Sequence, residues 1–172
     1  SQTEVKIVNK IHFNESGLSV SGAVYSAEGI LLRESRAENI TSLANTVTPV
    51  NLSLVETNDE FSTLFTFLHL KSAAGAILSK NFYWSSNAGL VKLRESRAVL
   101  NATAKILEPG PSQAQTQIEV HMQSVVRDNP IAFFVSLQLI RSESGTHTNT
   151  PWKRILPVFY SENYITMAPG EK

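Results

Sequence analysis

The chain has no cysteine, no excess of either charge and no long apolar run. Without cysteine, its 172 residues can form no disulfide framework, no thiolate zinc site and no thiol nucleophile. Its 15 basic and 15 acidic residues cancel, whereas a nucleic-acid footprint needs a basic patch or stripe. No apolar run approaches the roughly 20 residues that span a bilayer. We therefore expect neither a nucleic-acid partner nor a membrane span.

Signatures of catalysis and cofactor binding are equally scarce. The sequence contains no Gly-x-Ser-x-Gly, Walker or dinucleotide-binding glycine pattern. The histidines stand apart from one another, at spacings unlike those of metal ligands. No two carboxylates are nominated as the acid and the nucleophile that glycoside hydrolysis needs. We expect no catalytic residue, no metal and no cofactor in this chain.

What the sequence does have is alternation of apolar and polar residues with a period of two. Ile118, Val120 and Met122, for example, alternate with Glu119 and His121. This period places one set of side chains in a core and the other toward solvent, as in a half-buried antiparallel strand. The predicted strands cover 4–13, 18–25, 29–35, 38–43, 47–54, 62–70, 76–84, 100–107, 115–124, 132–141, 155–160 and 164–167.

Short strands separated by polar turns indicate an all-β protein made of two tandem immunoglobulin-like β-sandwiches. A boundary near 85–93 divides the chain into residues 1–88, with seven predicted strands, and residues 89–172, with five. The second sandwich has fewer strands than a closed one needs, so we expect it to lack its final strand and to leave an unpaired edge. The segment 61–70 also fits a helical stripe, but its aromatic content favours a strand.

Four aromatic residues are the candidate binding residues. Tyr83 and Trp84 close the first unit, and Trp152 and Tyr160 lie late in the second. Exposed rings of this kind could stack on the apolar face of a sugar. Alternating aromatics in strands more often pack in cores and interfaces, and packing is the favoured interpretation.

Four Asn-x-Ser/Thr sequons begin at Asn14, Asn39, Asn51 and Asn101. Each is a candidate N-glycosylation site, and together they permit a secreted glycoprotein without establishing one. An extracellular, periplasmic or vacuolar location is favoured over the cytoplasm, although the sequence does not decide the compartment.

Three motifs carry a resemblance to a known family. They are Leu78-Ser-Lys-Asn-Phe-Tyr-Trp84, Pro130-Ile-Ala-Phe-Phe-Val135, and Ile155-Leu-Pro-Val-Phe-Tyr-Ser-Glu-Asn-Tyr164 followed by Ala168-Pro-Gly-Glu171. In this order they resemble the two C-terminal immunoglobulin-like domains of glycoside hydrolase family 2. The branch they resemble holds the exo-β-D-glucosaminidases and the plant-type mannosylglycoprotein endo-β-mannosidases. The chain departs from that pattern at Glu162, where the family more often has Asp, and at Lys172, where the family continues into a final strand.

The resemblance implies a function within a larger enzyme. In that family an upstream (β/α)8 barrel carries two catalytic glutamates and hydrolyses its carbohydrate substrate with retention of configuration. No position here matches those motifs, so we expect a non-catalytic accessory portion of a β-glucosaminidase or β-mannosidase. Its expected partner is the barrel of the same protein or of a processed partner chain. A free-standing carbohydrate-binding or adhesion sandwich is the alternative.

Overall fold

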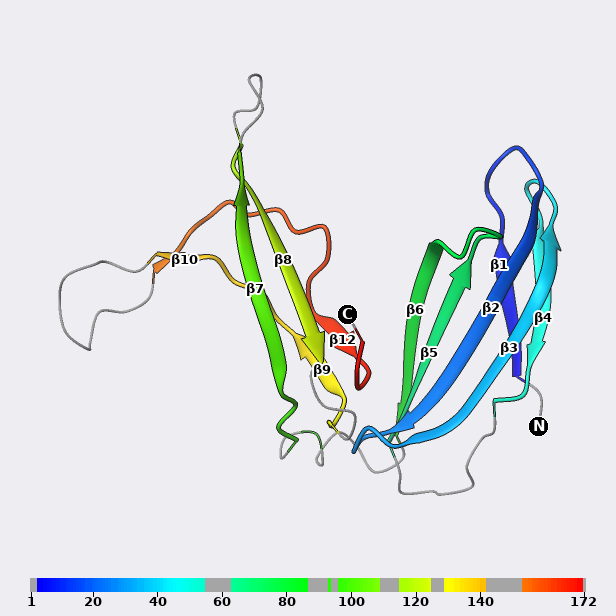
Figure 1. Cartoon of the computed structure of the whole chain (residues 1–172), viewed down its shortest axis with the longest axis horizontal. Helices are drawn as coiled ribbons and strands as arrows, with labels where there is room; N and C mark the ends of the chain where they lie inside the picture. Colours follow the sequence, from blue (N-terminus) through cyan, green and yellow to red (C-terminus); the bar gives the residue numbers. More distant parts are fainter. Residues whose placement is uncertain are drawn as a thin grey trace.

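The computed structural model of the chain describes residues 3–54, 63–86, 93, 96–108, 115–124, 129–141 and 153–171. These ranges contain strands and no α-helix, which confirms the all-β prediction. Figure 1 shows two groups of strands that meet at one end, with β1–β6 in one group and the later strands in the other. The strands are β1 (Thr3–Val8), β2 (Glu15–Ser26), β3 (Leu31–Ser42), β4 (Val47–Leu52), β5 (Thr63–Lys71), β6 (Ile77–Ser86), β7 (Leu100–Leu107), β8 (Gln117–Ser124), β9 (Ala132–Val135), β10 (Ile140–Arg141), β11 (Lys153–Arg154) and β12 (Ile165–Met167).

The described residues of the first half form two facing antiparallel sheets. One has four strands in the order β3-β2-β5-β6, and the other pairs β1 with β4. The alternating side chains of β1, β2 and β4 meet between the sheets, as the sequence predicts. Burying one such aliphatic side chain contributes roughly 1.5–3 kcal/mol. The buried members of this first core are Ile7, Val20, Val24, Val50, Leu52 and Leu54.

A second core covers the opposite face of the four-stranded sheet. Phe65 and Phe67 of β5 point into it and meet Ile131 and Ala168 from the second half of the chain. Leu64 and Leu68 of the same strand pack against the first core. Because both faces of β5 are covered, apolar residues follow one another along this strand. The sequence pattern of such a buried strand is as compatible with the apolar stripe of a helix as with a strand. The strand prediction for this segment is confirmed.

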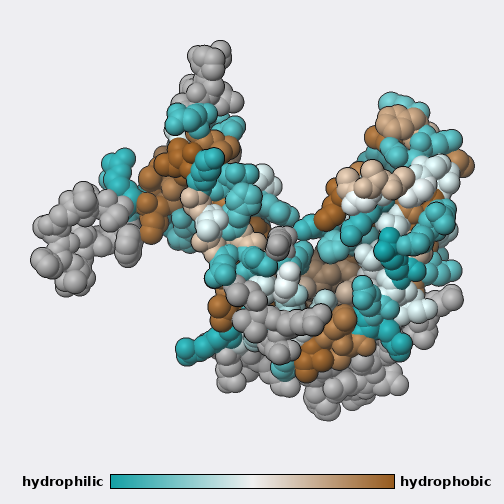
Figure 2. Space-filling model, in the orientation of Figure 1, coloured by the Kyte–Doolittle hydropathy of each residue, from teal (hydrophilic) through white to brown (hydrophobic). Residues whose placement is uncertain are grey.

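The described residues of the second half form three antiparallel pairs, β7 with β8, β9 with β12, and β10 with β11. The β7–β8 pair projects away from the junction in Figure 1. Directly opposite residues such as Ile106 and Ile118, or Ala104 and Val120, put apolar side chains on one face of this pair. Both isoleucines and Val120 are exposed, and Figure 2 shows hydrophobic residues gathered on the visible surface there.

The described first half has six strands where seven were predicted. The predicted strands 29–35 and 38–43 are one strand, β3, whose pairing with β2 shifts by one residue between Ala37 and Ile40. Asn39 has a φ of 57° inside this stretch. An extra residue in the left-handed region is a β-bulge, so the apparent break in the alternation marks a bulge and not a turn.

Three other predicted strands are shorter than expected or wrong. Strand 4–13 ends at Val8, because the Asn9 side chain accepts a hydrogen bond from Ile11 N at 3.0 Å and turns the chain. Strand 132–141 breaks into β9 and β10, with Phe134 at a φ of 52°. The predicted strand 155–160 is not formed. Its Pro157 has no N–H to donate to a ladder. Among the described residues, pairing here is limited to Lys153–Arg154 of β11 and one hydrogen bond from Ile155 N to Leu139 O at 3.0 Å.

Candidate functional site at the junction of the two halves

A tight turn after β12 brings the end of the chain against the four-stranded sheet. Pro169 and Gly170 occupy its middle positions, and Gly170 has a φ of 76°. Glu171 N donates to Ala168 O at 3.1 Å, and Ala168 N donates to the Glu171 carboxylate at 3.0 Å. Proline followed by a glycine with positive φ suits the middle of such a turn. The Ala-Pro-Gly-Glu motif therefore places one carboxylate in a fixed position.

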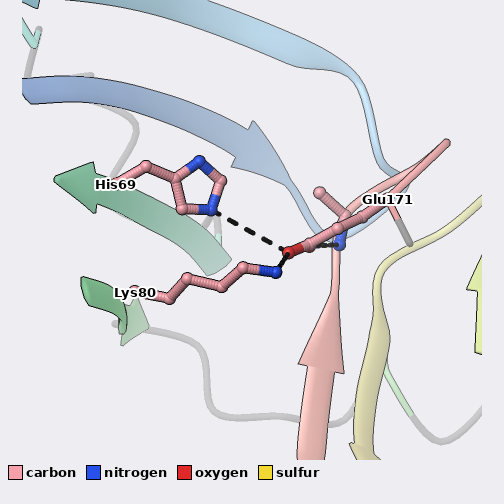
Figure 3. A network of polar contacts seen from close by, with 4 residues as sticks. His69, Lys80 and Glu171 are labelled. Carbon is pink, nitrogen blue, oxygen red and sulfur yellow. Dashed lines mark hydrogen bonds and ion pairs between the residues drawn. The ribbon is translucent and has the colours of Figure 1, made fainter. Parts of the chain in front are cut away.

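The Glu171 carboxylate contacts two neighbouring strands of the first half (Figure 3). Its Oε1 lies 3.4 Å from Lys80 Nζ in β6 and 3.9 Å from His69 Nε2 in β5. His69 and Lys80 are directly opposite each other in the sheet. The backbone carbonyl of Glu171 accepts a hydrogen bond from Ser124 N at the end of β8, at 3.0 Å. One residue thus joins strands from both halves.

Burial governs the electrostatics of this site. The pKa of His69 is lowered from its ordinary 6.5, first by burial and then by Lys80 and Lys71, although the Glu171 carboxylate acts in the opposite direction. Burial, helped by the charges of Glu34 and Glu171, raises the pKa of the Tyr25 phenol. Both rings are therefore neutral near pH 7. The positive charge that meets Glu171 comes from Lys80.

A shallow hollow of about 280 Å³ lies beside this network, with Tyr25, Glu34, Phe67, His69 and Glu171 among its lining residues. Over the described residues, no group of three or more His, Asp or Glu side chains is arranged to hold a metal ion. The Glu171 carboxylate is occupied by Lys80, His69 and the Ala168 N–H. The arrangement therefore holds the turn against the sheet.

Aromatic rings form the rest of the junction. Phe133 of β9 contacts Phe65 at 5.5 Å, Trp84 at 6.0 Å and Phe82 at 6.4 Å between ring centroids, each edge to face. Phe134 stacks on it at 4.1 Å. Edge-to-face pairs contribute about 0.5–1.5 kcal/mol beyond their buried area. Trp84 is thus part of the packing between the two halves.

The structure does not place the predicted aromatic residues on one platform. Trp84 is opposite Phe65 and Tyr83 is opposite Thr66, so the two rings point to opposite faces of β6. They are 45% and 58% exposed, and Tyr160, in the segment before β12, is 41% exposed. Trp152 lies outside the described residues. Sugar stacking by any of these rings stays a prediction.

The four sequon asparagines are all exposed, as glycosylation would require. Asn14 accepts a hydrogen bond from Ala44 N at 2.9 Å, and Asn39 lies in the bulge of β3. Asn51 and Asn101 lie in β4 and β7. Their glycosylation also stays a prediction.

Two asparagines that sequence reasoning missed hold the second half together. Asn129, which is buried, accepts a hydrogen bond from Val99 N at 2.9 Å and donates to Val99 O at 2.8 Å. Asn163 does the same for Leu137, at 2.8 Å and 3.2 Å. Each amide takes the place of a strand partner. The only signal in the sequence was their position beside turns, in Asp-Asn-Pro and Ser-Glu-Asn.

Comparison with known proteins gives consistent results. Residues 81–172 match the family described as the exo-beta-D-glucosaminidase Ig-fold domain. The exo-beta-D-glucosaminidase of Arthroderma benhamiae is 25% identical over 188 aligned positions, which cover 98% of this chain and 20% of that protein. The crystal structure of the exo-chitosanase CsxA of Amycolatopsis orientalis has the same fold, with a TM-score of 0.72 and 20% identity over 98% of this chain and 21% of its own. The chain spans about a fifth of the length of these relatives.

Proposed function

Because the chain belongs to the family of exo-beta-D-glucosaminidase Ig-fold domains, we propose that it serves as a non-catalytic accessory part of a retaining family 2 β-glycosidase. One observation carries the proposal: the family match covers residues 81–172 of a chain that corresponds to only a fifth of a glucosaminidase. The described residues support it, because the polar network around Glu171 holds a turn against a sheet.

The parent protein hydrolyses β-glucosaminides in this proposal, and β-mannosides are its second candidate substrates. Support comes from the relatives, which are an exo-beta-D-glucosaminidase and an exo-chitosanase studied with a β-D-glucosamine derivative. The reacting carboxylates belong to a (β/α)8 barrel in the remaining part of the same protein or in a processed partner chain. The chain contributes to that barrel as a buttress.

The buttress consists of two immunoglobulin-like units, residues 1–88 and 89–172. The second core and the contacts of Glu171 with His69 and Lys80 support a firm connection between them. A rigid pair of units would hold a neighbouring barrel in one orientation, whereas a flexible pair would not.

The test compares the full-length protein with the 172-residue chain on p-nitrophenyl β-D-glucosaminide and p-nitrophenyl β-D-mannoside. We expect turnover of the glucosaminide by the full-length protein and none by the chain alone. Turnover by the chain alone would contradict the accessory role. A full-length protein that is inactive on both substrates would contradict the family 2 assignment of the parent.

A second candidate function, carbohydrate binding by the chain itself, is favoured by the exposed rings of Tyr83, Trp84 and Tyr160. Titration calorimetry of the chain with chitosan oligosaccharides separates the two functions. A pure buttress gives no heat of binding. Binding heat that disappears in Tyr83→Ala and Tyr160→Ala would establish the binding module.

A further inference from the structure

The two sheets of the first half cover each other unevenly. Ser53 N, just after β4, donates to Ser35 Oγ of β3 at 3.0 Å, which fixes β4 beside β3. Within its own sheet, β4 pairs with β1, and the described part of this sheet has no strand beyond β1. Beyond β1 lies an open hollow of about 550 Å³, lined by residues of β1, β5 and β6.

The floor of this hollow has an apolar part, beside the polar side chains of Thr66, Ser79 and Asn81. Leu68 and Leu70 of β5 are half-buried there, and Tyr83 of β6 is 58% exposed. Val5 of β1 lines the side. In a closed sandwich these side chains would face a second sheet, because an inner sheet face is covered along its whole width.

The exposed edge of β1 presents unpaired backbone groups. Asn9 N donates to Thr46 O at 2.9 Å in the same register as the β1–β4 pairing. In an antiparallel pair, the backbone N–H and C=O groups of every second residue point toward the partner strand, and those of the residues between point away from it. The backbone groups of Thr3, Val5 and Ile7 therefore point toward β4. Those of Glu4, Lys6 and Val8 turn toward the hollow, where no described strand meets them.

The opposite edge of the same sheet is blocked. Pro49 stands opposite Lys6, so its nitrogen, which carries no hydrogen, lies on the side of β4 that faces away from β1. Proline and bulges are devices that keep an edge from pairing. β1 has neither, and its register runs without a shift from Thr3 to Val8. The β1 edge is therefore the one suited to accept a strand.

We propose that the hollow is the seat of a further β-strand, antiparallel to β1 and supplied by the segment of the protein that immediately precedes β1. Strands consecutive in sequence are usually neighbours, and a short hairpin would bring such a segment back along β1. The relatives are about five times longer than this chain, so their length allows for such a segment. This inference rests on the proposed function only in taking the chain as part of a longer protein.

The occupant has a defined chemistry. It is a strand of about six residues, with apolar side chains at the alternate positions that face Leu68, Leu70 and Tyr83. Its backbone pairs with Glu4, Lys6 and Val8. The sheet opposite β3-β2-β5-β6 then has three strands, which gives the sandwich the seven strands usual for the immunoglobulin fold.

The test is hydrogen exchange in the full-length protein, followed by NMR or by mass spectrometry with fragmentation to single residues. We expect the amides of Glu4, Lys6 and Val8 to exchange roughly 100-fold more slowly than unprotected surface amides. In a variant whose preceding segment of about 12 residues is replaced by a Gly/Ser linker, that protection should vanish. Exchange of these three amides at unprotected rates in the full-length protein would overturn the proposal.

Two further outcomes bear on the occupant. Protection that persists in the linker variant, or that grows with protein concentration, would assign the seat to another segment or to a second copy and would overturn the proposal.

Lys6→Pro should lower the Tm of the full-length protein by several degrees, whereas the control Lys6→Ala should not. A protein that hydrolyses the glucosaminide but leaves these amides unprotected would reject the strand and leave the proposed function standing.

Discussion

The Glu171 side chain connects the end of the chain to two strands of the first half. It is 19% exposed and contacts Lys80 and His69 while it accepts the Ala168 N–H. A hydrogen bond to a charged group of this kind contributes about 1.5–3 kcal/mol, which exceeds the value of a typical surface ion pair. The free energy of unfolding should therefore depend on this carboxylate.

Glu171→Gln should lower the free energy of unfolding by about 1–2 kcal/mol, because the amide keeps the shape but loses the charge. Urea denaturation followed by fluorescence measures the change. Glu162→Gln is the control, since Glu162 is exposed and its replacement should change stability by less than about 0.5 kcal/mol. Equal effects of the two changes would show that the Glu171 network contributes nothing specific.

His69 should make stability depend on pH. Its pKa in the folded chain is below the 6.5 of the unfolded chain, chiefly because of burial, so the unfolded chain takes up the proton first as the pH falls. The stability contribution of the neutral ring is complete above pH 6.5 and is lost as the pH falls below that value. The Tm of the wild-type protein should therefore drop more between about pH 7 and pH 5 than that of His69→Gln. Identical pH profiles would reject this role.

The alternation of apolar and polar residues predicted well which strands exist, but it predicted poorly where each strand begins and ends. A period of two reports which face a residue occupies, and that is enough to locate β2, β5 and β7. It does not report a bulge such as the one at Asn39, or a strand that ends because Asn9 turns the chain. The bulge depends on the pairing of β3 with β2, and the turn depends on a hydrogen bond between the Asn9 side chain and Ile11 N, and neither changes the period of the apolar residues.

The hexapeptide Leu-Arg-Glu-Ser-Arg-Ala shows the same limit. It occurs at 32–37 and again at 93–98. The first copy lies within β3, whereas the described residues of the second, Leu93 and Ser96–Ala98, are not in a strand. The first copy is a strand because it pairs with β2. Since both copies have the same sequence and the same local preference, tertiary contacts decide which of them forms a strand.

The segment between β9 and β10 should depend on the Asn163 side chain. Asn163→Ala removes both hydrogen bonds to the Leu137 backbone and leaves those groups without their partner. We expect a loss of about 1–3 kcal/mol, measured by chemical denaturation. The control is Asn101→Ala in β7, where the side chain is exposed and the change should be within about 0.5 kcal/mol. A small effect at Asn163 would mean that water replaces the amide there.

For the molecule as a whole, the alternation of apolar and polar residues and the spacing of the turns were enough to predict an all-β chain. They could not predict the junction. Phe65 and Phe67 signal burial in the sequence, but nothing local says that their partners are Ile131 and Ala168, more than sixty residues away. Glu171 likewise gains its role only from its contacts with a sheet whose Lys80 lies 91 residues earlier.

Gly29 offers a test of whether the halves unfold together. It has a φ of 81°, and a Cβ there would overlap the Asn129 carbonyl oxygen of the second half. Gly75 has a φ of 82° and open space around it, so Gly75→Ala should cost only about 1 kcal/mol, for the backbone conformation. Gly29→Ala should cost clearly more and shift a single calorimetric transition of the whole chain. Two transitions, with only one of them shifted, would show that the halves unfold independently.

The four-stranded sheet has one consequence for how such proteins change over evolution. Its two faces are covered by different parts of the chain, β1 and β4 on one side and residues around Ile131 and Ala168 on the other. A recombination event near residue 88 would join a sheet to an unrelated covering layer and leave Phe65 and Phe67 in water. The two halves should therefore be inherited as a single unit, and a transplant of this chain into a glycosidase should function only when both halves are moved together.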